Sequence, residues 1–417
     1  MRLRRPDRSR GSVRPTRRGI ALLVAALVTF VMAPILSLPA LLQVTSLLLG
    51  LVALGAAFAS LGQVRVEVER TVDPEVLTPG ERGTVTVHVT NRSPLPTLES
   101  RWSDGVPRAV TATAGGTLPG LGRRGSRRAR VRVRYEVRAA RRGRHELGPL
   151  RVAVSDPFGL VRREHQHGVS TSVLVLPRQT TLWPLAPRGA DNDGASRPAP
   201  QNVGVGDDDI IARAYLPGDA LKRMHWKATA HRGELMVRQE EQQVNPRAAV
   251  LVDTRAHTYG SEQDRTGRWD ESPAFEWAVS AAASVTAHLV RIGYAVTTGA
   301  TGSDRVRLLG DGHDTLEDAM VDLAELDPHP SADLEGVDPG ERTVFVVLGR
   351  VDEARALEWR DALAYADTVL AFVAAGSPAR ALDVLSAARW RCVEYRPGDD
   401  VAERWNDLDG SRSLAAS

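Results

Sequence analysis

The pattern of apolar and polar positions changes three times along the chain. Residues 19–62 form a run of about 44 positions without one charged side chain, twice the ~20 residues that a helix needs to span a bilayer. Two prolines and Ser37 interrupt this run near its middle. We therefore expect two membrane-spanning helices, roughly Ile20–Leu36 and Ala40–Leu61. A buried hairpin of a soluble domain is the alternative, which the lack of a polar face on either helix disfavours.

After residue 62 the period becomes two, as in the runs VRVEVERTV and TVTVHVT, which a Pro-Gly turn separates. Alternation of this kind predicts strands with one buried face. Further strands are expected at 129–137, 150–155 and 172–176. Short strands between turn signals predict a small all-β sandwich over residues 63–185, similar to an immunoglobulin-like domain. A linker rich in Pro, Gly, Asn and Asp is expected at 186–206.

Residues 248–417 alternate apolar strand-like runs with helical patterns. Strands are expected at Ala248–Val252, Tyr294–Thr298, Thr343–Leu348, Thr368–Val373 and Arg391–Tyr395. Helices are expected at Pro273–Ile292, Thr315–Leu326, Asp352–Tyr365 and Pro378–Ala388. This order predicts an α/β domain with a mostly parallel sheet, covered by helices on both faces. The chain is therefore expected to be a multi-domain protein: a two-helix transmembrane hairpin, an all-β domain and an α/β domain.

Charge is distributed unevenly over these parts. The tail of residues 1–18 carries about +7, residues 63–185 about +10, and the remainder about −14. A basic tail stays in the cytoplasm by the positive-inside rule, so a hairpin returns the chain there. We expect a multi-pass protein of the cell membrane with cytoplasmic domains and an anionic lipid surface as one partner. Nucleic acid is the competing partner for so many arginines, but no recognition motif accompanies them.

Few residues suggest catalysis. The single cysteine, Cys392, cannot form an intramolecular disulfide and is expected in the core. The sequence has no phosphate-binding loop, no His-Glu-x-x-His and no Gly-x-Ser-x-Gly. His165 and His167 could bind a metal as a pair on a strand, but we favour a surface pair. The arginine row, Arg130, Arg132, Arg134 and Arg138, is interpreted as a solvated strand face or as a membrane contact.

The segment 207–247 concentrates unusual residues, including the only two lysines, Lys222 and Lys227. Asp219 can cap a helix that Gly233 ends, and Met236 and its neighbours continue as a strand. Along this helix Arg223, Lys227 and His231 recur every four residues, and like charges at that spacing need an anionic counterpart. We favour an internal ion-pair clamp with nearby acidic residues. A binding site for an outside anion or partner is the alternative.

This segment resembles the signature of the bacterial family called domain of unknown function 58. The family's pattern is roughly R-x-Y-x-x-G-D-x-x-R-x-I-D-W-K, followed by A-R-x-G-x-L-x-V-R, and Met224-His225 replace its Ile-Asp here. The residues that we assign to the signature, as candidates for partner binding, are Arg213, Tyr215, Gly218, Asp219, Arg223, Trp226, Lys227, Arg232, Glu234 and Arg238. Upstream, the run RRGRHELGP and the turn DPFGL at 156–160 resemble a second segment of the family, with a structural role for the turn.

The resemblance implies a von Willebrand factor A-like α/β domain. Such domains often hold Mg²⁺ at an Asp-x-Ser-x-Ser loop after their first strand. Here the loop reads Asp253-Thr254-Arg255-Ala256-His257, which lacks both serines and contains an arginine. We therefore predict a degenerate site without metal or other cofactor, in which Asp253 pairs with Arg255 or with a basic residue of the signature helix. The alternative is an ion held by Asp253 and Asp352 through waters.

Two classes of function remain open. The first is a non-catalytic interaction or scaffold protein, because the resemblance implies a MoxR-type AAA+ ATPase as partner, often with a transglutaminase-like membrane protein, in complex assembly or remodelling. The second is a hydrolase using Asp219, His225 and Lys227, or a metal-dependent adhesion-type binding module. Nothing in the spacing orders those three residues as nucleophile, base and orienting group. We therefore expect a protein that is not an enzyme.

Overall fold

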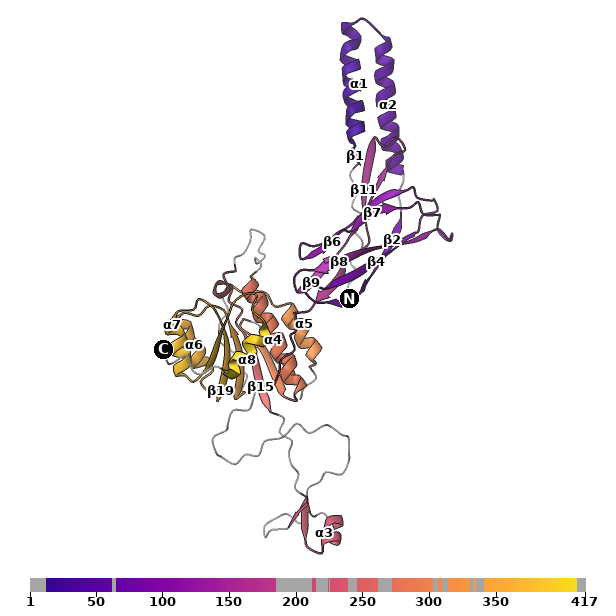
Figure 1. The fold of residues 1–417 in the computed structure, drawn as a ribbon. Helices are drawn as coiled ribbons and strands as arrows, with labels where there is room; N and C mark the ends of the chain where they lie inside the picture. Colours follow the sequence, from indigo (N-terminus) through magenta and orange to yellow (C-terminus); the bar gives the residue numbers. More distant parts are fainter. Residues whose placement is uncertain are drawn as a thin grey trace. The chain divides into compact units, whose positions relative to one another are not determined.

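The structure, a computed structural model, describes residues 13–61, 65–184, 212–214, 224, 226–238, 246–261, 272–302, 307–309, 314–330, 334 and 341–410. The chain divides between Arg178 and Gln179 into two units. The first holds the N-terminal part together with Met320–Leu326, and the second holds the rest. Figure 1 draws both, and each is described by itself below.

The first unit begins with a hairpin of two apolar helices, α1 (Arg17–Ile35) and α2 (Ala40–Leu61), side by side in Figure 1. Both are long and apolar enough to cross a membrane. At ~1.5 Å per residue α1 extends ~28 Å, close to the ~30 Å of a bilayer core. The helices contact through small side chains, and the hydroxyls of Thr29 and Thr45 lie 2.9 Å apart. The expectation of two long apolar helices is confirmed.

Strands make up the rest of this unit. They are β1 (Val13–Pro15), β2 (Val66–Asp73), β3 (Val76–Leu77), β4 (Arg82–Asn91), β5 (Ser100–Asp104), β6 (Val110–Ala112), β7 (Gly115–Leu118), β8 (Arg130–Ala139), β9 (Gly143–Leu147), β10 (Leu150–Ser155), β11 (Val161–His167) and β12 (Thr171–Val175). They form sheets of order β2-β4-β8-β6, β1-β11-β10-β5-β7 and β3-β12-β9. Alternate residues of β4 and β8 fill the core, so the predicted period of two is confirmed there.

A buried polar group ties two of these sheets together. Arg70 of β2 donates from Nε and Nη2 to the two oxygens of Asp104 on β5, at 2.9 and 2.8 Å. The hydroxyl of Tyr135 on β8 donates to the same carboxylate at 2.8 Å. Burial, then the Asp104 charge, raises the pKa of Tyr135, so it stays a donor at neutral pH. Each charge is therefore paired, as burial requires.

His165 and His167 are placed differently from our expectation of a surface pair. Both rings are half-buried on one face of β11, with centroids 5.9 Å apart. Their Nε2 atoms have no hydrogen-bond partner among the described residues. Burial lowers both pKa values, that of His167 to about 4, with smaller contributions from Arg163 at His165 and from His165 at His167. The rings are therefore neutral at physiological pH.

The second unit contains a two-stranded and a six-stranded sheet. Its elements are β13 (Ala212–Ala214), α3 (Trp226–Arg232), β14 (Met236–Arg238), β15 (Arg247–Val252), the 3₁₀ helix η2 (Ala256–Tyr259), α4 (Pro273–Arg291), β16 (Ala295–Ala300), β17 (Arg307–Leu309), β18 (Thr343–Leu348), α6 (Glu353–Ala362), β19 (Thr368–Ala374), α7 (Ala379–Ala387), β20 (Arg391–Tyr395) and α8 (Val401–Gly410). Helix α5 (Leu316–Ala324) is divided between the units, because its residues from Met320 onward belong to the first. Residues 179–184 also belong to the second unit: Trp405 donates to the carbonyl of Trp183 at 2.7 Å.

The large sheet has the order β17-β16-β15-β18-β19-β20 and is parallel except for β17, which runs antiparallel to β16. It confirms the predicted mostly parallel sheet, while β17 and α8 were not predicted. Helices cover both faces: α6 and α7 pack in one core cluster, and α4 contacts β15, β16 and β18. Cys392 lies in that cluster as expected, and burial raises its pKa to about 12.

Candidate functional site

The winding of the large sheet reverses between β15 and β18, which are its central strands. In doubly wound sheets of this order, ligands bind in the crevice outside the carboxyl ends of the strands at that reversal. Asp253 follows β15 and Gly349 follows β18, so these two loops form the crevice here. The backbone N–H of Asp253 donates to the carbonyl of Val347 at 2.9 Å, which fixes the Asp253 loop to β18.

Asp253 is fully buried and pairs with Arg255. The guanidinium donates from Nε to Oδ1 at 2.9 Å and from Nη2 to Oδ2 at 3.1 Å, and the backbone N–H of Arg255 adds a third bond at 3.1 Å. On its outer side Arg255 donates from Nη1 to Glu358 at 3.3 Å and lies 5.9 Å from the ring of Trp359. The predicted pairing of Asp253 with Arg255 is confirmed.

The threonines around this pair are also hydrogen-bonded. Thr254 donates to the carbonyl of Thr301 at 2.5 Å, and Thr301 donates to Oδ1 of Asp253 at 3.4 Å. Thr258 donates to the carbonyl of Arg255 at 2.7 Å, and a Cβ at Gly349 would lie only 2.2 Å from this Thr258 hydroxyl. The crevice is thus filled by side chains of its own loops.

Asp352 plays a separate, local role. Its carboxylate caps α6 by accepting from the backbone N–H of Arg355 at 2.9 Å, and it is exposed. Such a cap satisfies one free N–H of the first turn and suits the helix dipole. Over the described residues, no group of three or more His, Cys, Asp or Glu is placed to hold a metal ion.

Burial and pairing fix the protonation of the groups around the pair. Burial raises the pKa of Tyr259 and of Tyr395 well above the ordinary value, with a further contribution from the Asp253 charge, so both stay protonated. His257 is exposed, and its pKa is lowered by desolvation, then by Arg355 and Arg255. The carboxylate that could act as a base is bound to a guanidinium on both oxygens.

The signature segment forms a β-hairpin strand pair with a helix before its second strand. Arg213 lies on β13 opposite Val237, and Arg238 on β14 pairs with Ala212. Helix α3 begins at Trp226, so Met224, which the predicted helix includes, lies before it, whereas Gly233, with φ +75°, ends it as predicted. The signature residues Tyr215, Gly218, Asp219 and Arg223 lie outside the described residues, as do His225 and the expected linker 186–206.

One side of α3 presents an aromatic side chain to solvent. Trp226 is 68% exposed, and Leu235 is exposed after the helix. His231, Arg232 and Glu234 are exposed around the end of α3, whose basic residues suit the negative end of the helix dipole. Thr229 accepts from the backbone N–H of Met236 at 3.0 Å, which fixes α3 against β14.

A second junction, at the base of the helical hairpin, was not predicted as a site. The turn Asp156–Leu160 joins β10 to β11, and Thr16, the N-cap of α1, donates from its hydroxyl to Gly159 at 2.6 Å and from its backbone N–H to Leu160 at 2.8 Å. A Cβ at Gly19 would lie 2.1 Å from the Leu160 carbonyl oxygen. The signal in the sequence was a glycine placed where the charged tail meets the apolar run.

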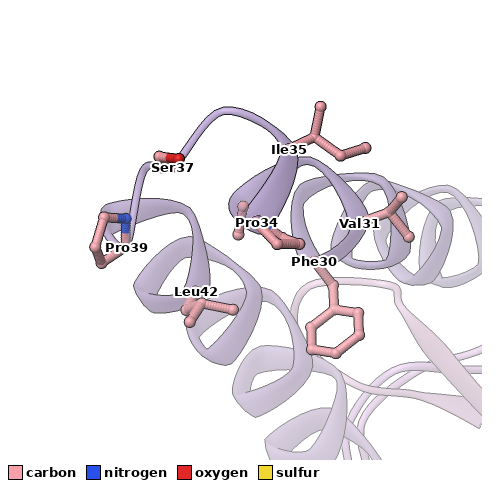
Figure 2. A pocket seen from close by; sticks show the side chains of 8 residues that line it. Phe30, Val31, Pro34, Ile35, Ser37, Pro39 and Leu42 are labelled. Atoms are coloured by element: carbon pink, nitrogen blue, oxygen red, sulfur yellow. The ribbon is translucent and has the colours of Figure 1, made fainter.

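An apolar hollow of about 920 Å³ lies at the other end of the hairpin, where α1 and α2 are joined (Figure 2). Its lining residues are Phe30, Val31, Ala33, Pro34, Ile35, Ser37, Pro39 and Leu42. A single hydroxyl, that of Ser37, interrupts an otherwise hydrocarbon surface. The lining offers no acid, base or metal ligand, and its chemistry fits an acyl chain or another apolar segment.

Similarity to solved structures is slight. The CARDB domain of the PF1109 protein from Pyrococcus furiosus is 15% identical over 27% of this chain and 89% of that chain, with a TM-score of 0.19. The alkylpurine DNA glycosylase AlkC from Pseudomonas fluorescens is 18% identical over 29% of this chain and 33% of that chain, with a TM-score of 0.18. At these scores neither carries an argument about this protein.

Sequence comparison is more informative. The uncharacterized protein YeaD from Bacillus subtilis (strain 168) is 23% identical over 248 residues, which are 57% of this chain and 56% of YeaD. The chain thus matches about half the length of this curated relative. Residues 211–348, from the signature segment to the end of β18, match the family model described as "Protein of unknown function DUF58".

Proposed function

We propose that this chain is a membrane-anchored, non-catalytic interaction protein that presents its α/β domain and the α3 segment to a cytoplasmic MoxR-type AAA+ ATPase, in the assembly or remodelling of a protein complex. A transglutaminase-like membrane protein is a further partner under this proposal. The two long apolar helices and the basic tail support the anchoring and its direction. The match of residues 211–348 supports the choice of partner through the family resemblance.

The proposal includes a finer description of the two folded domains. The strand order of the large sheet, with an antiparallel edge strand β17, supports a von Willebrand factor A-like domain. The antiparallel sheets β2-β4-β8-β6 and β1-β11-β10-β5-β7, which share one core with the smaller third sheet, support an immunoglobulin-like sandwich in the first unit. The buried Asp253–Arg255 pair supports a domain that works without metal, because the carboxylate already meets a cation.

The observation that carries the proposal is the exposure of Trp226 in the signature segment. An internal ion-pair clamp is formed by charged residues and does not account for an exposed tryptophan in the same segment. Tryptophan and arginine are the residues that most often dominate binding at protein interfaces. Arg232, exposed at the other end of α3, adds a positive charge to this segment, which suits an acidic patch on the partner.

Co-purification of the solubilised full chain with the ATPase tests this. We expect Trp226→Ala and Lys227→Ala each to abolish or strongly weaken co-purification. Trp183→Ala is the matched control, because Trp183 is equally exposed at 70% and lies in the same unit. Equal loss in all three variants, or no loss at Trp226, would show that α3 is not the docking surface.

A further inference from the structure

We infer that the Asp156–Leu160 turn is a lipid-contacting element, in which Phe158 enters the membrane interface and the nearby arginines bind anionic headgroups. The inference rests on the proposed membrane anchoring and extends it from the two helices to the all-β domain. It assigns a binding partner, an anionic bilayer surface, to a turn for which the sequence predicted only a structural role.

The turn is built to hold Phe158 outward. The buried Asp156 carboxylate accepts from the backbone N–H of Val161 at 2.6 Å and of Phe158 at 3.0 Å. Gly159, with φ +68°, closes the turn and donates back to the Asp156 carbonyl at 3.0 Å. Phe158 remains 53% exposed on this clamped backbone. Transfer of this ring from water to an apolar environment would be favourable.

Both hairpin helices meet the turn at a glycine. Gly19 of α1 approaches the carbonyl of Leu160, and a Cβ at Gly55 of α2 would lie 3.2 Å from the Asp156 carboxylate. Leu160 and Val161 share an apolar cluster with the two helices; its other members are Leu22, Leu51, Val52, Ala56 and Ala59. Figure 1 shows β11 entering the base of the hairpin. The turn therefore packs directly against both helices of the hairpin.

The contacts with the two helices show where the turn lies along the uncharged run of the hairpin. Thr16, which bonds to Gly159, is followed by Arg17 and Arg18, and the uncharged run begins at Gly19. Gly55, beside Asp156, lies well inside that run on α2. The turn thus lies where a bilayer containing these helices changes from headgroups to hydrocarbon. Aromatic side chains are enriched at this depth.

The charges around the turn fit an anionic surface. Arg14 of β1 is directly opposite Arg162 of β11, and both are exposed. Like charges opposite each other in a sheet are destabilising without a counterion. Arg17 and Arg18 are exposed on the next residues of the chain. No acidic side chain pairs with these four arginines within the part of the chain that the structure describes, which leaves lipid phosphates as their counterions.

The test uses the full chain in vesicles of phosphatidylcholine and phosphatidylglycerol. Cys392→Ala removes the only cysteine, and an environment-sensitive fluorophore is attached to one new cysteine at a time: Phe158→Cys, Leu27→Cys in α1, and Val169→Cys. Val169 is 67% exposed and lies beyond the far end of β11, a strand that extends ~20 Å from Val161 at ~3.3 Å per residue. The readout is quenching by lipids that carry a spin label either near the top or near the end of the acyl chain.

We expect quenching at positions 27 and 158 and none at 169. Quenching at 27 but not at 158 would overturn this inference and leave the anchoring intact. No quenching at 27 would overturn the anchoring and this inference with it. In a second arm, a higher fraction of phosphatidylglycerol should increase the quenching at 158, and Arg14→Gln with Arg162→Gln should remove that increase. An unchanged increase would mean that these arginines do not bind the headgroups.

Discussion

Asp253 and Arg255, two residues apart in one loop, form a fully buried ion pair in which both carboxylate oxygens accept from the guanidinium, at 2.9 and 3.1 Å. The position is the winding reversal of a parallel sheet, where many proteins of this architecture bind a ligand. Here the chain supplies its own cation. The arrangement makes the loop part of the core, since removal of either partner leaves an uncompensated charge in the interior.

Loss of one partner should therefore be costly. We expect Asp253→Ala to lower the free energy of unfolding of the α/β domain by ~3–5 kcal/mol, because the buried Arg255 then keeps only the longer contact to the half-exposed Glu358. Asp367→Ala, which breaks an exposed pair of 2.9 Å with Arg342, is the control and should cost under ~1 kcal/mol. Denaturant titration followed by tryptophan fluorescence measures both. Equal losses would mean that the buried pair contributes no more to stability than the exposed pair does.

Divalent ions should leave the α/β domain unaffected. We expect the melting temperature of the full chain to stay the same when EDTA or Mg²⁺ is added, since Arg255 already provides the positive charge beside Asp253. An ion that bound only the folded state would raise the melting temperature with concentration. A rise with Mg²⁺ that disappears in Asp253→Asn would show that a metal displaces the guanidinium, contrary to our prediction.

The half-buried histidines should make the all-β domain sensitive to acid. Burial lowers the pKa of His167 to about 4 from an ordinary 6.5. Between these values the unfolded chain binds a proton that the folded ring does not, so the free energy of unfolding should fall as pH falls from about 6.5 to about 4. His167→Gln cannot titrate and should show a shallower fall than the parent. Identical pH profiles of the two would contradict the burial of a neutral ring.

Glycine at position 19 should be required for the hairpin to meet β11. A Cβ there would lie 2.1 Å from the carbonyl oxygen of Leu160, so we expect Gly19→Ala to separate α1 from the turn and to increase protease cleavage near Thr16. Gly50→Ala is the matched control, because no atom lies within 4 Å of a Cβ at that position of α2. Similar cleavage of both variants and the parent would mean that the contact is dispensable.

Elements with a strong periodic pattern could be predicted from the sequence. The strands Thr343–Leu348 and Arg391–Tyr395 have the predicted bounds, and α2 spans the predicted Ala40–Leu61. β11, with the sequence VRREHQH, was missed because it has no apolar alternation and is stabilised by its pairing with β10 and β1. Whether such a segment forms a strand depends on its tertiary contacts rather than on its own sequence.

In the candidate site, contacts between residues close in sequence could be predicted, and contacts between distant residues could not. The Asp253–Arg255 pair was one of two pairings predicted when the loop was compared with the metal loop of the family that it resembles, and residues two apart in a loop can meet locally. Glu358, which binds the outer side of Arg255, lies 103 residues further along the chain, and no local pattern points to it. The bond between Thr16 and Leu160 spans 144 residues and was missed for the same reason. Long-range partners of this kind become visible only in the fold.

The attachment of α1 to the turn has a mechanical consequence. Thr16, at the start of the helix, is hydrogen-bonded to Gly159 and Leu160, the last residues before β11. No flexible linker separates the helix from this turn. Under the proposed anchoring, a helix that tilts to fit a thin or thick bilayer would pull on the sheet to which Thr16 binds it. Bilayer thickness would then act as tension on the strands of the first unit.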